Sequence, residues 1–163
     1  MDNLKLYNID ADYINYLLPY APHLFHNKKP GQQNERKYIG IVLKINDVNY
    51  FAPLSSFKAK HSAMNEALDF LKIKNYAVIN LNTMFPVPNG VFTYVDISKE
   101  RNPKYRSLLL AEYRCIHSMQ DRIRKNAKNV YKHKVQNGDA TRLAQRCNDF
   151  LLLEKLSRSY HHP

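Results

Sequence analysis

Short apolar runs, rich in β-branched and aromatic residues, recur through the first hundred positions of the chain, a pattern typical of strands. They predict strands over residues 4–9, 37–45, 48–54, 77–81 and 91–97. The run 37–45 is the densest in Ile, Val and Leu, and Asn46-Asp47 after it predicts a two-residue hairpin turn. Gly40 inside this run predicts a bulge or a close backbone approach.

Helical spacing occurs over two short stretches before residue 100. Asp10 precedes a short helical stretch that Pro19 ends, and residues 19–34, rich in proline and polar side chains, are expected to form a loop. Residues 61–72 predict a second helix, because apolar side chains recur there at intervals of three and four. These side chains are Met64, Ala67, Leu68 and Leu71.

The spacing is helical over most of the chain after residue 102. Asn102 and Pro103 supply a capping residue followed by proline at the first helical position, which predicts the start of a long helix. Its apolar face is expected to comprise Tyr105, Leu108, Leu109, Ile116, Met119 and Ile123. Asn137-Gly138-Asp139 interrupts the pattern before a last helix. That helix carries Leu143, Phe150, Leu151, Leu153 and Leu156.

The order of these elements bears on the fold class. Strands early in the chain and helices late favour an α+β fold over a doubly wound α/β sheet. With 163 residues the chain is long enough to bury a substantial core, and we expect a single domain over residues 1–163.

The chain is strongly basic, since Lys and Arg number 25 against 14 Asp and Glu, a formal net charge of +11. This imbalance favours a polyanionic partner, with nucleic acid ahead of an anionic membrane surface. The 12 Tyr and 7 Phe residues offer faces on which unpaired bases stack, although for any single Tyr the core is the better assignment. The N-terminus lacks the blocks of a signal peptide and no apolar run approaches a membrane span, so we expect a cytoplasmic protein without a membrane partner.

No metal or cofactor is expected from the motifs. The sequence has no Walker loop, no GxGxxG and no HExxH, and its seven histidines do not cluster. Cys115 and Cys147 lie far apart and fit no zinc pattern, so we expect free thiols.

Candidate chemistry concentrates in residues 52–61, at the end of the hairpin's second arm. This segment gathers two hydroxyls, two ammonium groups and an imidazole: Ser55, Ser56, Lys58, Lys60 and His61. Hydroxyls and cations hydrogen-bond phosphate oxygens, and catalysis at phosphorus needs such donors held in position. The alternative is that Ser55 or Ser56 caps the following helix, whose N-terminus would itself suit an anion.

Arg36 and Lys37, at the start of the densest strand, have two interpretations. They are either charges that protect a sheet edge or groups that reach the serine segment across the hairpin. In a hairpin with the expected turn, Lys37 and Arg36 fall close to opposite Ser56 and Phe57, which places a guanidinium beside the proposed site.

Four segments, in this order along the chain, resemble the toxins of type III toxin–antitoxin systems, the ToxN/AbiQ family with its CptN and TenpN branches. They are YIGIVL at 38–43, YFAPLSSFK at 50–58, INL at 79–81 and, as a weaker match, CNDFLL at 147–152. The resemblance runs through most of the chain, and the hairpin with its serine loop is its more specific part.

This resemblance implies a metal-independent endoribonuclease without a cofactor. The implied fold is a compact, twisted antiparallel β-sheet core related to the Kid/MazF toxins, with the long helix and the C-terminal helix around it. The implied partner is an RNA antitoxin, made as tandem repeats that the toxin processes into pseudoknots. Toxin and RNA would close into an inactive assembly with only minor toxin–toxin contacts. Cellular and phage RNA in the bacterial cytoplasm would be the substrates, in stress and in abortive phage infection.

The resemblance also implies roles for individual residues. Ser56 matches the essential active-site serine of the family, Ser55 its neighbouring hydroxyl and Lys58 its phosphate-binding lysine. Arg36 stands where the family often has Lys, which keeps the charge. Gln32 stands where a relative has Tyr.

RNA cleavage without a metal most simply uses the substrate's own 2′-OH, which attacks phosphorus and leaves a 2′,3′-cyclic phosphate and a 5′-OH. We assign Ser56, with Ser55 beside it, to orienting the 2′-OH or the phosphate, because no base paired with a serine nucleophile is evident. Lys58 and Arg36 would offset the charge on the phosphorane. The catalytic candidates are Ser56, Lys58, Ser55 and Arg36.

Several other residues are candidates for contact with RNA, each with a structural alternative. His61 is a candidate proton donor or an exposed residue in the first helical turn. Tyr38 and Tyr50 either stack on bases or belong to the core. Arginines on the long helix contact phosphates or form a solvated face. The RNA-binding candidates are Lys37, Lys60, His61, Gln32, Lys28, Lys29, Tyr38, Arg114 and Arg122.

Two other functions fit part of the sequence. A non-catalytic RNA-binding module explains the charge and the aromatic residues, but not the convergence of hydroxyls and Lys58 beside Arg36. A DNA-binding regulator is less favoured, because the sequence has no helix-turn-helix signature with a convincing recognition helix. Cleavage that survives a chelator and is lost in Ser56→Ala would exclude the RNA-binding module.

Overall fold

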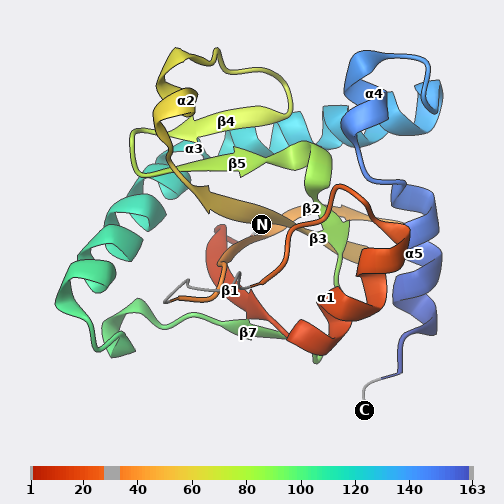
Figure 1. Ribbon diagram of the computed structural model, residues 1–163. Helices are drawn as coiled ribbons and strands as arrows, with labels where there is room; N and C mark the ends of the chain where they lie inside the picture. Colours follow the sequence, from red (N-terminus) through yellow and green to blue (C-terminus); the bar gives the residue numbers. More distant parts are fainter. Residues whose placement is uncertain (1, 28–33, 162–163) are drawn as a thin grey trace.

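The computed structural model describes residues 2–27 and 34–161, and these form an α+β fold as expected (Figure 1). The strands are β1 (Lys5–Ile9), β2 (Tyr38–Ile45), β3 (Val48–Ser56), β4 (Phe70–Ile73), β5 (Ala77–Asn80), β6 (Phe85–Pro86) and β7 (Phe92–Tyr94). They pair antiparallel in the order β4-β5-β3-β2-β1-β7, and β6 pairs with β3. The helices are α1 (Ala11–Leu17), α2 (Ala59–Ala63), α3 (Pro103–Asn137), α4 (Arg142–Arg146) and α5 (Phe150–Ser159), with 3₁₀ turns at Leu18–Tyr20, Leu81–Thr83 and Ile97–Lys99.

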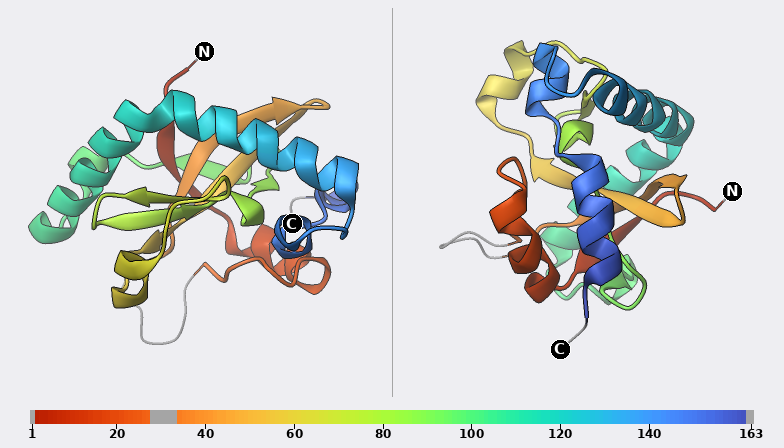
Figure 2. Two further views of the ribbon diagram at one scale, coloured as in Figure 1. Left: turned by 90° about the horizontal axis from the view of Figure 1, so that it is seen from above. Right: turned by 90° about the vertical axis from the view of Figure 1, so that its right-hand side faces the viewer.

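Helices pack against both faces of the sheet, so the central strands β2 and β3 are buried on two sides over most of their length. The long helix α3 runs along one face of the sheet. Helices α1 and α5 lie next to each other on the other side of the molecule (Figures 1 and 2). Successive residues of a strand point to opposite faces. Ile39 and Tyr50 accordingly belong to the core that contains Ile116 of α3, whereas Tyr38 and Phe51 belong to the core that contains residues of α1.

The hairpin between β2 and β3 has the expected turn and a bulge at the expected glycine. Asn46 and Asp47 both have positive φ, at 51° and 63°, which matches the twist that two-residue hairpin turns require. Pairing is regular from Ile45 opposite Val48 to Leu43 opposite Tyr50, and then Gly40 lies opposite Phe51. Two residues of β2 are therefore unpaired, and every position of β2 before Gly40 is shifted by two against β3.

We expect Gly40→Ala to destabilise the protein by about 1–3 kcal/mol, the usual cost of overpacking a core. A Cβ at this position would overlap Cε2 and Cδ2 of the Phe51 ring, which is fully buried. Urea unfolding of Gly40→Ala, Phe51→Leu and the double variant measures this effect. A smaller ring should relieve the clash, so the double variant should lose less stability than the two single losses added together. If Gly40→Ala were as stable as the wild type, the close packing of the Phe51 ring against Gly40 would be contradicted.

The helix expected over residues 61–72 is wrong. Helix α2 ends at Ala63, and Phe70–Ile73 forms strand β4 instead. A turn with Lys74 at φ 49° leads β4 back onto β5, where Leu71 pairs with Ile79. The apolar spacing was compatible with both structures, and the strand prevails because it places Leu71 and Ile73 in the core and pairs their backbone with β5.

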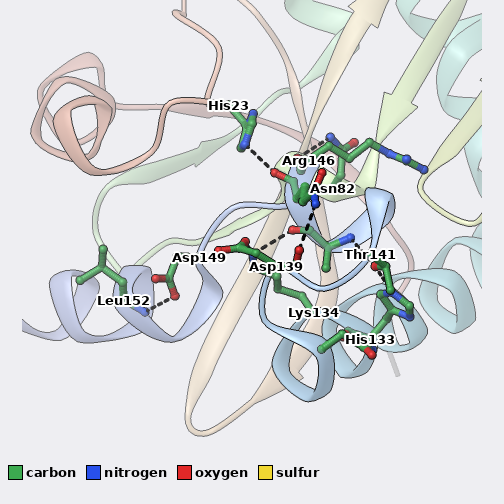
Figure 3. Close-up of polar contacts among 12 residues, drawn as sticks. His23, Asn82, His133, Lys134, Asp139, Thr141, Arg146, Asp149 and Leu152 are labelled. Atoms are coloured by element: carbon green, nitrogen blue, oxygen red, sulfur yellow. Dashed lines mark hydrogen bonds and ion pairs between the residues drawn. The ribbon is translucent and has the colours of Figure 1, made fainter.

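The single last helix expected after residue 139 is also wrong, because the chain forms two helices, α4 and α5. The break follows Cys147: the buried Asn148 donates its backbone N–H to the Asn82 carbonyl at 2.9 Å, and the Asp149 side chain caps α5 at the N–H of Leu152. Figure 3 shows the polar contacts that hold α4 in place. They include His133–Thr141 at 2.6 Å, Lys134–Asp139 at 2.9 Å and Asn82–Arg146 at 3.0 Å.

The remaining expectations agree with the structure within a few residues. The Asn102 side chain caps α3 by accepting the N–H of Tyr105, and Gly138, at φ 57°, follows its last residue. The strand expected over 91–97 is shorter, because a 3₁₀ turn begins at Ile97. Cys115 and Cys147 are free thiols. In the part of the chain that is described, no helix combines the length and hydropathy needed to cross a membrane.

Candidate functional site

A cleft of about 630 Å³ lies where the start of β2, the end of β3, helix α2, strand β5 and the first half of α3 meet. These elements can be followed on the left side of Figure 1. The cleft is lined by all four catalytic candidates, Ser55, Ser56, Lys58 and Arg36, and by Lys37, Lys60 and His61. Sequence segments on both sides of the hairpin are thus brought to one concave surface, as expected.

Arg36 is joined directly to the serine segment. Its Nη1 donates to Ser55 Oγ at 2.8 Å and to the Leu54 carbonyl at 3.3 Å, and its Nε donates to the His26 carbonyl at 3.2 Å. The guanidinium also lies 4.7 Å from the ring centroid of Phe25. Burial lowers the pKa of Arg36, but guanidinium remains charged at any physiological pH. Contacts on several sides hold this half-buried cation beside the Ser55 hydroxyl.

The expected register of this pair is wrong by two residues. The Lys37 backbone carbonyl accepts the N–H of Leu54 at 3.0 Å, so Lys37 lies opposite Leu54, not Ser56. The bulge at Gly40 is the cause, because it shifts the start of β2 by two positions against β3. As a result Arg36 meets Ser55, where an unbulged hairpin would have placed it opposite Phe57.

Neither serine caps the helix that follows. Ser56 is the exposed last residue of β3, and Lys58 is the N-cap residue of α2. The Lys58 N–H donates to Nδ1 of His61 at 2.8 Å, and the His61 N–H donates to the Lys58 carbonyl at 2.9 Å. The serine hydroxyls are therefore not used by the helix, and the backbone of Lys58 is held by a closed pair of hydrogen bonds.

His61 is buried, with 7% of its surface exposed, so its assignment as an exposed helical residue is wrong. Its ring packs between Phe57 and Phe70, with centroids 5.6 and 5.7 Å away. Because Nδ1 accepts a hydrogen bond, the proton of the neutral ring is on Nε2. Burial, followed by the charges of Lys60, Lys58 and Lys72, lowers the pKa of His61. This environment disfavours the imidazolium that a proton donor would need at neutral pH.

Helix α3 forms one wall of the cleft, and this part of the site was not predicted from the sequence. Tyr105, Leu108 and Glu112 line the cleft, together with Asn80 of β5. Glu112 is only 5% exposed, and burial raises its pKa from 4.5 to about 7, against the opposing influence of Lys37. The signal in the sequence was a carboxylate on the apolar face of α3, one turn after Leu108 and Leu109.

Other candidates lie elsewhere. Tyr38 and Tyr50 are fully buried core residues, and their hydroxyls donate to Asn27 and to Glu154, so they do not stack on bases. Arg114 is exposed on α3 outside the cleft, and Arg122 pairs with Glu66 at 2.8 Å. Lys28, Lys29 and Gln32 are outside the described residues.

The cleft offers hydroxyls and cations to one ligand. Lys58 and Lys60 are exposed at its rim and Lys37 is half-buried, with Nζ 5.8 Å from the ring centroid of Tyr105. Within residues 2–27 and 34–161, no three His, Cys, Asp or Glu side chains gather in a way that could hold a metal ion. Donors of this kind suit phosphate oxygens, and held in place they can stabilise charge that develops at phosphorus.

Comparison with known proteins assigns the chain to a family. The sequence model described as toxin ToxN of the type III toxin–antitoxin system matches residues 5–158. The curated protein named Endoribonuclease ToxN, from Bacillus thuringiensis subsp. kurstaki, is 31% identical over 167 residues, which cover 98% of this chain and 85% of that protein.

Two solved structures share the fold over nearly their whole length. One comes from work on a processed non-coding RNA that regulates a bacterial antiviral system; its TM-score is 0.86 at 27% identity, covering 97% of this chain and 99% of that one. The other comes from work on selective toxin inhibition by a non-coding RNA pseudoknot; its TM-score is 0.83 at 29% identity, covering 98% of both chains. The chain belongs to the ToxN family of type III toxin–antitoxin toxins.

Proposed function

We propose that this endoribonuclease cleaves RNA in the cleft between β2, β3, α2 and α3. The main support is the hydrogen bond from Arg36 to Ser55, which fixes a guanidinium beside the Ser55 hydroxyl in a cleft that Ser56, Lys58 and Lys60 also line. A preorganised set of donors is the main requirement for catalysis at phosphorus, because the charge that develops there needs stabilisation without reorganisation.

The proposed reaction uses the 2′-OH of the substrate as the nucleophile. The 2′-oxygen attacks the adjacent phosphorus, its proton passes to solvent or a cleft base, and the bond from phosphorus to the 5′-oxygen breaks. The 5′-oxygen takes up a proton, which leaves a 2′,3′-cyclic phosphate and a 5′-OH. Ser56, with Ser55, orients the scissile phosphate, while Lys58 and Arg36 stabilise the negative charge of the phosphorane. No step of this proposed route requires a metal ion.

The proposed inhibitor is a folded non-coding RNA, as the work on a related structure describes for its own toxin. The net charge of +11 suits a polyanion that covers a large surface, and RNA binding should therefore weaken steeply with salt. We further propose that the protein works in the bacterial cytoplasm, on cellular and phage RNA, and that the inhibitory RNA is processed from a repeat precursor into a closed toxin–RNA assembly.

The function is tested by incubating the protein with a long unstructured RNA in excess EDTA, beside Ser56→Ala and Ser62→Ala. We expect discrete fragments with 2′,3′-cyclic phosphate ends from the wild type, and a rate about 10²–10³-fold lower for Ser56→Ala. Ser62 is the matched control, since it is an exposed serine of α2 that does not line the cleft and donates only to the Ala59 carbonyl. If the RNA is bound tightly but stays intact, the proposed cleavage would be rejected in favour of a non-catalytic RNA-binding module.

A further inference from the structure

One carboxylate in the wall of the cleft lacks the partners that buried charges normally have. Glu112 is 5% exposed and lines the cleft from α3. Among the described residues, none forms a hydrogen bond or an ion pair with its carboxylate. Burying a carboxylate without partners is unfavourable, so such a group either takes up a proton or finds a partner in a ligand.

The charges around Glu112 come from three segments. Lys37, at the start of β2, is the cation that acts on Glu112, and burial lowers the pKa of Lys37 while Glu35, Glu100 and Glu112 raise it. Tyr105, two helical turns before Glu112, has its pKa raised to about 12 by burial first and by Glu112 and Glu100 next. The other titratable or charged groups of the cleft are Arg36, Lys58, Lys60 and His61.

An RNA phosphate in this cleft would change the balance at Glu112. It would add a negative charge near the carboxylate and would compete with it for Lys37, which is the interaction that favours ionised Glu112. Both effects favour the protonated form, and a protonated carboxyl has an O–H to donate to an anion or a base. Little further change is needed at Glu112, because burial already raises its pKa to about 7.

We propose that Glu112 contacts RNA as a neutral carboxylic acid: it takes up one proton when RNA enters the cleft and donates that proton in a hydrogen bond to the RNA. The proposal rests on the proposed function only for the identity of the ligand. It makes Glu112 a binding residue of the site, and it predicts that RNA and a proton bind together.

His61 does not account for such a linkage. Its Nδ1 accepts the Lys58 N–H, and burial, followed by the surrounding lysines, lowers its pKa. Protonation would place a second proton on Nδ1, which already accepts the Lys58 N–H, so we do not expect RNA binding to protonate His61 above neutral pH. Measurements above neutral pH therefore separate the two groups.

The test measures the affinity of a fully 2′-O-methylated single-stranded RNA by fluorescence anisotropy, between about pH 6.5 and 8.5, for wild type, Glu112→Gln and Glu35→Gln. Methylation blocks the nucleophile, so binding is measured without cleavage. We expect wild-type affinity to fall by nearly tenfold for each pH unit above about 7. Glu112→Gln, a neutral isostere that keeps a donor, should bind with little change over this range. Glu35→Gln is the matched control, since Glu35 lines the same cleft from an exposed position. Its RNA affinity should change with pH as that of the wild type does.

Calorimetry at about pH 8, in two buffers of different ionisation enthalpy, counts the protons directly. We expect close to one proton taken up per wild-type complex and close to none for Glu112→Gln. If Glu112→Gln does not fold, the wild-type proton count still decides, and a count of zero would overturn the proposal. Equal pH dependence of wild type and Glu112→Gln would overturn it as well. Neither outcome would touch the nuclease, which is judged separately by cleavage of unmodified RNA.

Discussion

Replacing Arg36 with Ala should lower the single-turnover rate of RNA cleavage by about 10²–10³-fold, the usual cost of removing one preorganised donor from a site of this kind. The physical reason is that the guanidinium is held by Ser55, by two backbone carbonyls and over the Phe25 ring, so it needs no reorganisation when charge develops at phosphorus. Arg36→Lys keeps the charge but not the planar set of donors, and we expect an intermediate rate. Rates at saturating enzyme, with RNA binding measured separately, distinguish this effect from weaker binding.

Arg142→Ala is the control for Arg36→Ala, because it removes the same net charge from an exposed position on α4, outside the cleft. It should cleave at nearly the wild-type rate. If the two alanine variants lose the same activity, Arg36 acts only through the overall charge of the protein. The specific role at Ser55 would then be rejected.

We expect replacing Glu154 with Ala to destabilise the fold by about 2–6 kcal/mol, because two tyrosine hydroxyls lose their acceptor at about 1–3 kcal/mol each. The Glu154 carboxylate is the shared acceptor for Tyr50 at 2.6 Å, Tyr131 at 2.7 Å and Asn46 at 3.1 Å. These donors come from β3, from α3 and from the hairpin turn, so Glu154 ties α5 to all three. Without it, the Tyr50 hydroxyl is left fully buried with only the Phe150 carbonyl, 3.5 Å away. Urea unfolding measures the loss.

Two further variants bracket the Glu154→Ala result. Glu154→Gln keeps an oxygen acceptor of the same size and should lose clearly less stability. Glu66→Ala removes a carboxylate whose ion pair with Arg122 is exposed, and pairs of that kind contribute about 0–1 kcal/mol. A loss in Glu154→Ala no larger than that in Glu66→Ala would show that the network does not hold α5.

The parts of the fold that local chemistry specifies could be predicted from the sequence. The turn at Asn46-Asp47 needs two residues that tolerate positive φ, and the start of α3 needs a capping side chain before Pro103. Both requirements are met by neighbouring residues, without help from the rest of the chain. The segment 61–72 shows the limit of this reasoning, since its apolar spacing fits a helix but β5 recruits its second half as β4.

The candidate site divides in the same way. By itself the sequence determined the family resemblance, the hydroxyls and cations of residues 55–58, and the hairpin that would bring Arg36 near them. Only the tertiary structure decided that Arg36 meets Ser55, because the shift depends on how the Phe51 ring packs against Gly40. It alone decided the proton affinity of Glu112 too, because burial and the charge of Lys37 act on that carboxylate from segments far away in the sequence. Register across a bulge and the pKa of a buried group depend on packing between distant residues, whereas turns and caps depend on adjacent ones.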